Sequence, residues 1–357
     1  MSLSVTAKLG FLALLGLAAC KKDTPPQDNP PIVYATVSTL AGNGTSGYID
    51  GSAATAQFYG PEGAAVDAQG NVFIADNGNS CIRKVTPAGV VSTLAGNPTP
   101  GLVNGPLAAA RFNGPIDVAF DGQGNLYVAD FGNNCLRKIT PAGVVSTLAG
   151  TGVAGFVDGS AITARLAQPN GVAVDAQGVV YFTEYGNHSV RKVLPNGTVS
   201  TIAGTGQEGY ADGPGRSAQL SSPEGLTVDA QGTIYVAEFG GQRIRKISPS
   251  GTVSTLAGSG VRGYADGAGS AAQFYGACGV AIDAHGDLLV ADAGNYCVRK
   301  VTPAGVVSTL AGTRTSGFAD GPVASAKFNT LSGLTIGAGG VVYVTEYGER
   351  IRKITAE

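Results

Sequence analysis

Several residue types are scarce in this chain of 357 residues. It contains no tryptophan, one methionine and two histidines, and only 13% of its residues are charged. Two histidines are too few for a three-histidine zinc site. Lysine and arginine (23) nearly balance aspartate and glutamate (25), for a net charge of −2. Such a chain lacks the concentrated basic surface that nucleic-acid binding requires, so we expect no nucleic-acid partner.

Glycine, in contrast, is abundant, with 55 residues, and hydrophobic residues make up 43% of the chain. The glycines show no Gly-X-Y period, which excludes collagen, and the hydrophobic content is too high for a disordered protein. Abundant glycine together with valine, isoleucine and threonine favours many short strands joined by tight turns.

The N-terminus predicts export and anchoring. Residues 1–19 carry a single charge, Lys8, followed by an apolar run over residues 9–17 that is shorter than the about 20 residues a membrane-spanning helix needs. The run ends in the letters LAAC at Cys20, which resembles a bacterial lipobox. We therefore predict a signal peptide over residues 1–19 and lipidation of Cys20; the alternative is an ordinary signal peptide with an incidental cysteine.

Residues 20–35 consist of the predicted lipidated cysteine and a tether. The tether contains four prolines and reads KKDTPPQDNPPIVYA. Such a segment is semi-stiff and too polar for a core, and its acyl chains would hold the protein on a membrane. We expect a location in the cell envelope, either periplasmic or at the cell surface.

The rest of the chain, residues 36–357, is a sixfold repeat with a period of 54 residues. The segment VSTLAG, once spelled VSTIAG, starts at Val37, Val91, Val145, Val199, Val253 and Val307. An exact period of this length indicates a repeat architecture. In the first copy, alternating apolar residues and Gly-containing turns predict four short strands over residues 63–67, 71–75, 81–86 and 90–94.

Six copies of four antiparallel strands predict an all-β fold, a six-bladed β-propeller of four-stranded blades. The chain opens with a fourth strand (residues 37–40) and ends with a third strand (residues 351–355). The N-terminal strand should therefore complete the last blade and close the ring, which leaves no open sheet edge between the first and last blades. We expect a monomer.

A long connection, residues 42–61 in the first copy, precedes the first strand of each unit. Two apolar columns recur in it, and they predict that the loop packs onto its blade; the alternative is an aromatic ring that stacks on a ligand. The columns are Tyr48, Leu102, Phe156, Tyr210, Tyr264 and Phe318, and Phe58, Phe112, Leu166, Leu220, Phe274 and Phe328. An acidic or amide residue follows the first column by two positions, at Asp50, Asn104, Asp158, Asp212, Asp266 and Asp320.

The stretch GPEGAAVDAQGNVFIADNGNSCIRKVTPAGVVSTLAG resembles an NHL repeat, and all six copies over residues 36–355 share its pattern. The resemblance implies the propeller fold and a role in binding, since NHL-like propellers include protein-binding and RNA-binding modules, sensor domains and a peptide-amidating lyase. The lyase chemistry needs a histidine-rich metal site. His188 and His285 lie in turns at opposite ends of their blades and cannot share a metal.

Carboxylates close the second strand of every unit, at Asp76, Asp130, Glu184, Glu238, Asp292 and Glu346. Their presence in all six copies favours a structural role, with bonds from the turn and from the arginine of the third strand; the alternative is a ring of cation sites. Cys81, Cys135 and Cys297 share one column, and equivalent positions in different blades are too far apart for a disulfide, so we interpret them as small buried hydrophobic residues.

One column varies while its neighbours stay constant, at the start of the innermost strand. It should ring one mouth of the central channel, on the face of the long loops. In one copy the glycine that follows this column is replaced by Asp117. The candidate ligand-site residues are therefore Glu62, Ile116, Asp117, Asn170, Glu224, Cys278 and Ser332. No histidine shares this column to activate Cys278, so we expect no nucleophile there. The alternative is that a solvent-facing column varies freely.

The column is also similar to the calcium site of six-bladed gluconolactonase and regucalcin-like propellers. This resemblance implies Glu62, Asn170 and Glu224 as ligands of Ca²⁺ and Asp117 as a candidate base, with the ion polarising a lactone carbonyl or activating water. Ile116 departs from that family, because it stands near a channel asparagine of the family and cannot coordinate an ion. We therefore favour a binding scaffold for a protein, a carbohydrate or a small ligand, with a metal-dependent lactone or ester hydrolase as the first alternative and a purely structural or sensory envelope component as the second.

Overall fold

A computed structural model describes residues 1–2 and 32–356 of the chain. The predicted signal peptide, Cys20 and most of the predicted tether lie outside the described residues. The chain divides into two units, Met1–Pro31 and Ile32–Glu357, and the following concerns the second. Among the described residues, no helix has the length and apolar character needed to cross a membrane.

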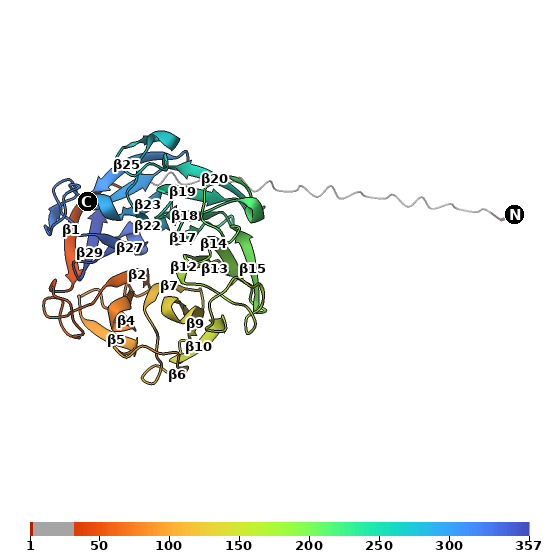
Figure 1. Cartoon of the computed structure of the whole chain (residues 1–357), viewed down its shortest axis with the longest axis horizontal. Helices are drawn as coiled ribbons and strands as arrows, with labels where there is room; N and C mark the ends of the chain where they lie inside the picture. The colour runs from red at the N-terminus through yellow and green to blue at the C-terminus, as the bar shows by residue number, and fades with distance from the viewer. Residues whose placement is uncertain (3–31, 357) are drawn as a thin grey trace. The chain divides into compact units, whose positions relative to one another are not determined.

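Six antiparallel sheets surround a central axis (Figure 1), which confirms the predicted six-bladed propeller. The innermost strands are β2 (Pro61–Val66), β7 (Pro115–Phe120), β12 (Pro169–Val174), β17 (Pro223–Val228), β22 (Ala277–Ile282) and β27 (Leu331–Ile336). The second strands are β3 (Val72–Asp76), β8 (Leu126–Asp130), β13 (Val180–Glu184), β18 (Ile234–Glu238), β23 (Leu288–Asp292) and β28 (Val342–Glu346). Each innermost strand contacts those of the two neighbouring blades, and β27 returns to β2.

The outer strands complete each blade. The third strands are β4 (Cys81–Val85), β9 (Cys135–Ile139), β14 (Ser189–Val193), β19 (Arg243–Ile247), β24 (Cys297–Val301) and β29 (Arg350–Ala356). The fourth strands are β5 (Val91–Gly96), β10 (Val144–Ala149), β15 (Thr198–Ala203), β20 (Thr252–Ala257), β25 (Val306–Ala311) and β1 (Tyr34–Ala41). Short 3₁₀ helices occur at η1 (Asn77–Asn79), η2 (Phe131–Asn133), η3 (Gly215–Ser217), η4 (Gly269–Ala271), η5 (Ala293–Asn295) and η6 (Ala338–Gly340).

Five blades carry a fifth strand, where the sequence predicted four. These two-residue strands are β6 (Gly105–Pro106), β11 (Gly159–Ser160), β16 (Gly213–Pro214), β21 (Gly267–Ala268) and β26 (Gly321–Pro322). Each belongs to the long loop and pairs with the fourth strand, as Gly105 does with Val145. The loop thereby covers the outer edge of its blade, which an unpaired strand would expose.

The N-terminal strand closes the ring. β1 lies antiparallel to the C-terminal β29, with Val37 opposite Ile354 and Ser38 opposite Lys353. This confirms the predicted closure. β1 begins on the face of the turns between first and second strands, where the Tyr34 hydroxyl donates to the Gly340 carbonyl at 3.0 Å.

Apolar side chains fill the space between neighbouring blades. Phe73 of blade 1 meets Phe120 of blade 2 edge to face, with ring centroids 4.9 Å apart, an arrangement that aromatic pairs favour. Cys81, Cys135 and Cys297 are unpaired and fully buried, which confirms their interpretation as small hydrophobic residues.

A buried arginine in each third strand holds the long loop on its blade. The Arg83 guanidinium lies 2.7 Å from the Asp76 carboxylate, with neither side chain exposed, and 2.6 Å from Asp50 in the loop. It also lies over the rings of Tyr48 and Phe58. The same arginine–carboxylate pair recurs in all six blades. The loop packing and the structural role of the acidic column are therefore confirmed.

Candidate functional site

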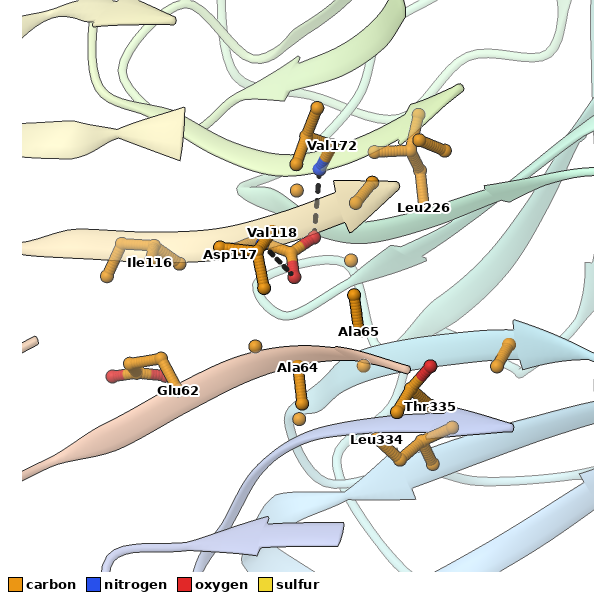
Figure 2. A pocket seen from close by; sticks show the side chains of 18 of the residues that line it. Glu62, Ala64, Ala65, Ile116, Asp117, Val118, Val172, Leu226, Leu334 and Thr335 are labelled. Carbon is orange, nitrogen blue, oxygen red and sulfur yellow. Dashed lines mark hydrogen bonds between the residues drawn. The ribbon is translucent and has the colours of Figure 1, made fainter. Parts of the chain in front are cut away.

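The seven candidate residues lie along one cavity on the axis of the ring, with a volume of about 590 Å³. All six innermost strands contribute to its wall, each from its second residue onward. Figure 2 shows Glu62 and Ile116 at one end of the cavity, with Asp117 farther along the same wall. The structure thus brings together residues that are up to 270 positions apart in the chain because every innermost strand begins at the same face.

Aromatic side chains join this end of the cavity, and the sequence analysis did not identify them. Phe131, Tyr185 and Tyr347 come from the turns that follow the second strands, and all three contribute to the wall. The Tyr347 hydroxyl donates a hydrogen bond to the Glu62 carboxylate of the next blade. The sequence contained a signal for them, because the position after the acid that ends each second strand also varies between the copies. Its residues are Asn77, Phe131, Tyr185, Phe239, Ala293 and Tyr347.

Glu62 and Glu224 come from blades 1 and 4, which are opposite one another in a ring of six. Burial raises the pKa of Glu62 to about 8; the Tyr347 hydrogen bond opposes this rise, and the charge of Asp117 adds to it. Burial also raises the pKa of Glu224 to about 8, with a further contribution from Glu62. No described residue donates a hydrogen bond to the Glu224 carboxylate. Among the described residues of the cavity wall, these two carboxyl groups are accompanied by no lysine, arginine or histidine.

Asp117 is engaged differently, because its carboxylate connects two innermost strands. Oδ1 accepts the Val118 N–H at 2.8 Å, and Oδ2 accepts the Val172 N–H of the next blade at 2.9 Å (Figure 2). Burial raises its pKa to about 7, against these two hydrogen bonds. Because both oxygens accept hydrogen bonds, the carboxylate links β7 to β12. To act as the predicted base, it would have to give up one of these two hydrogen bonds.

The other polar members of the column divide into two groups. The Cys278 thiol is 6% exposed and lies 3.6 Å from the Ala291 carbonyl and 3.5 Å from the Leu331 carbonyl, either of which can accept its one proton, and burial raises its pKa well above the usual range. The Ser332 hydroxyl donates to the Pro61 carbonyl. Asn170 lines the cavity and has no polar side-chain partner among the described residues. Capacity to bind a ligand therefore lies with Glu62, Asn170 and Glu224.

These three are the residues for which the sequence predicted calcium binding. Within residues 32–356, no three His, Cys, Asp or Glu side chains converge as metal ligands. Ca²⁺ takes six to eight oxygen ligands, and two carboxylates with one amide would leave most positions to water. Calcium binding by Glu62, Asn170 and Glu224 stays a prediction.

The sequence model of the NHL repeat matches residues 58–85, 112–139, 166–193 and 220–247. Each match runs from the long loop to the end of the third strand of its blade. The chain carries NHL repeats. With the six-bladed fold, this confirms the resemblance drawn from the sequence.

Two curated relatives are similar to this chain over part of their own length. Protein SUPPRESSOR OF QUENCHING 1 of Arabidopsis thaliana is 30% identical over 281 residues, which cover 73% of this chain and 27% of the relative. NHL repeat-containing protein 2 of Bos taurus is 30% identical over 316 residues, 77% of this chain and 43% of the relative. The chain thus spans less than half the length of either relative.

Solved structures share the fold at lower identity. A protein of unknown function from Bacteroides thetaiotaomicron has a TM-score of 0.71 and 21% identity, covering 90% of this chain and 76% of that one. An auxiliary nutrient binding protein from the same organism has a TM-score of 0.69 and 17% identity, covering 90% and 76%. A gluconolactonase from Xanthomonas campestris has a TM-score of 0.60 and 17% identity, covering 93% and 96%. At these identities the likeness shows the fold alone.

Proposed function

We propose that this NHL propeller is a binding protein of the cell envelope that takes a small polar ligand in its axial cavity. The observation that carries the proposal is the cavity of about 590 Å³, built where the six repeats differ from one another. Three blades supply Glu62, Asn170 and Glu224 with unused polar atoms, and turns supply Phe131, Tyr185 and Tyr347. A concave wall that combines apolar and aromatic surface with a few polar groups is typical of small-molecule sites.

The envelope location rests on the sequence at the N-terminus. The lipobox-like LAAC at Cys20 and the proline-rich tether support membrane attachment through a lipid. The chain enters the propeller at Tyr34, on the face opposite the end of the cavity that holds Glu62. The polar end of the cavity and the long loops beside it therefore lie on the face opposite Tyr34.

Thermal unfolding of the full-length chain tests the binding function. A panel of sugars, amino acids, amines and lactones would be added to the chain and to Glu224→Gln, Asn170→Ala and Glu208→Gln. The last changes an exposed carboxylate of a long loop outside the cavity wall. A ligand at a hundred times its Kd stabilises the folded state by about 2.7 kcal/mol. We expect a ligand that raises the midpoint of the parent and of Glu208→Gln but not of the cavity variants; equal responses in all four would overturn the proposal.

The hydrolase alternative uses the same unpaired oxygens of Glu62, Asn170 and Glu224. If these residues hold Ca²⁺, the ion would supply a Lewis acid at the end of the cavity where a lactone carbonyl could enter. Ca²⁺ and EDTA would then shift the unfolding midpoint in opposite directions, and lactone turnover would be lost in Glu62→Gln. Turnover with this metal dependence would replace binding as the function of the site.

A further inference from the structure

We propose that the ligand of the axial cavity is an organic cation, whose ammonium group lies between Glu62 and Glu224. The inference rests on the proposed binding function and names the class of ligand for that same cavity.

The charge of the cavity wall points to a cation. Among the described residues, the acidic groups of the wall are Glu62, Asp117 and Glu224, and no lysine, arginine or histidine lines the cavity. Asp117 is satisfied by two backbone N–H groups, whereas the Glu224 carboxylate receives no hydrogen bond in the described part of the chain. The ionised glutamates would repel an anion, whereas a cation would balance their charge and offset their desolvation.

The aromatic side chains favour an ammonium ion carried on carbon over a bare metal ion. Phe131, Tyr185 and Tyr347 contribute to the cavity wall, and the Tyr347 hydroxyl donates to the Glu62 carboxylate. Aromatic rings attract ammonium groups through their negative faces and accept the attached methyl or methylene groups through apolar contact. The volume of about 590 Å³ exceeds what one ion fills, and no three His, Cys, Asp or Glu side chains of residues 32–356 converge on a point.

Isothermal titration of the full-length chain with matched probes tests the inference. The probes are choline, its neutral isostere 3,3-dimethylbutan-1-ol, and 1,4-diaminobutane. We expect at least one of the two cations to bind with an affinity about tenfold or more above that of the neutral isostere.

Two variants separate the outcomes. The double variant Glu62→Gln/Glu224→Gln should lose cation binding, whereas Glu208→Gln should retain it. Equal affinity for choline and the neutral isostere, or no binding of either cation at millimolar concentration, would each overturn the inference. If neutral sugars or lactones instead stabilise the parent and not the cavity variants, the proposed binding function stands and only the ligand class is wrong.

Discussion

The Tyr347 hydroxyl donates a hydrogen bond to the Glu62 carboxylate across the closure of the ring. Tyr347 belongs to the last blade, which is completed by the N-terminal strand, and Glu62 opens the first blade. The two residues are 285 positions apart in the chain. The polar end of the cavity is therefore assembled only when the ring is closed, and folding and the ligand site depend on the same strand pairing.

Removal of this hydroxyl should change the acidity of Glu62. The hydrogen bond from Tyr347 stabilises the ionised carboxylate, so Tyr347→Phe should raise the pKa of Glu62 further above about 8. The side chain is half exposed, and we expect a loss of stability of at most about 1 kcal/mol. Carboxyl ¹³C chemical shifts followed against pH would report the change. Tyr59→Phe, at an exposed ring of the same face, is the control, and an unchanged Glu62 titration in Tyr347→Phe would contradict the prediction.

Stability should fall as pH rises through the neutral range because of the two cavity glutamates. Each has a pKa raised from the ordinary 4.5 to about 8 in the folded state. Between these values the folded chain binds more protons than the unfolded chain, so the stabilisation present below about pH 4.5 is lost progressively up to about pH 8. Urea unfolding at a series of pH values would measure this slope.

The variant Glu62→Gln/Glu224→Gln should flatten the same profile, since neither amide titrates. It should match the parent near pH 5 and exceed it near pH 9, by about 1 kcal/mol or more. Parallel profiles for parent and double variant would show that the two carboxyl groups ionise freely in the folded chain.

The sequence predicted the architecture well because the repeat period determines the number of blades. It predicted the site less completely. The repeat period, the turn residues and the position of the first strand were sufficient to predict six blades and the closure of the ring. The fifth strands, such as β6 (Gly105–Pro106), escaped because two residues have no alternation to detect. Tyr347 escaped because its contact with Glu62 joins different blades and different columns. The sequence indicated Asp117 as a candidate base, because a sequence does not show that backbone N–H groups from two strands donate to its oxygens.

The buried arginines should be far more sensitive to substitution than exposed ones. Arg137→Met leaves the Asp130 carboxylate, 2.8 Å away and fully buried, without its cation. Removing one partner of a buried ion pair costs about 3–5 kcal/mol, which should be visible in urea unfolding. Arg216→Met is the matched control, because Arg216 is 70% exposed and its bond to Asp158 should contribute less than about 1 kcal/mol. Similar losses in both variants would contradict a structural role for the buried pair.

Asp117 offers a test of whether its carboxylate is a strut or a reactive base. Five of the six repeats have glycine at this position, and Asp117 alone joins β7 to β12 through the N–H groups of Val118 and Val172. Asp117→Asn must place an amide NH₂ against one of these donors, so we expect a loss of about 1–3 kcal/mol. Asp117→Gly introduces the glycine of the other blades and removes a buried acid. In urea unfolding it should therefore lower the stability less than Asp117→Asn does. The opposite order, or loss of ligand turnover with full stability in Asp117→Asn, would indicate that this carboxylate serves chemistry in the cavity instead of the packing of its wall.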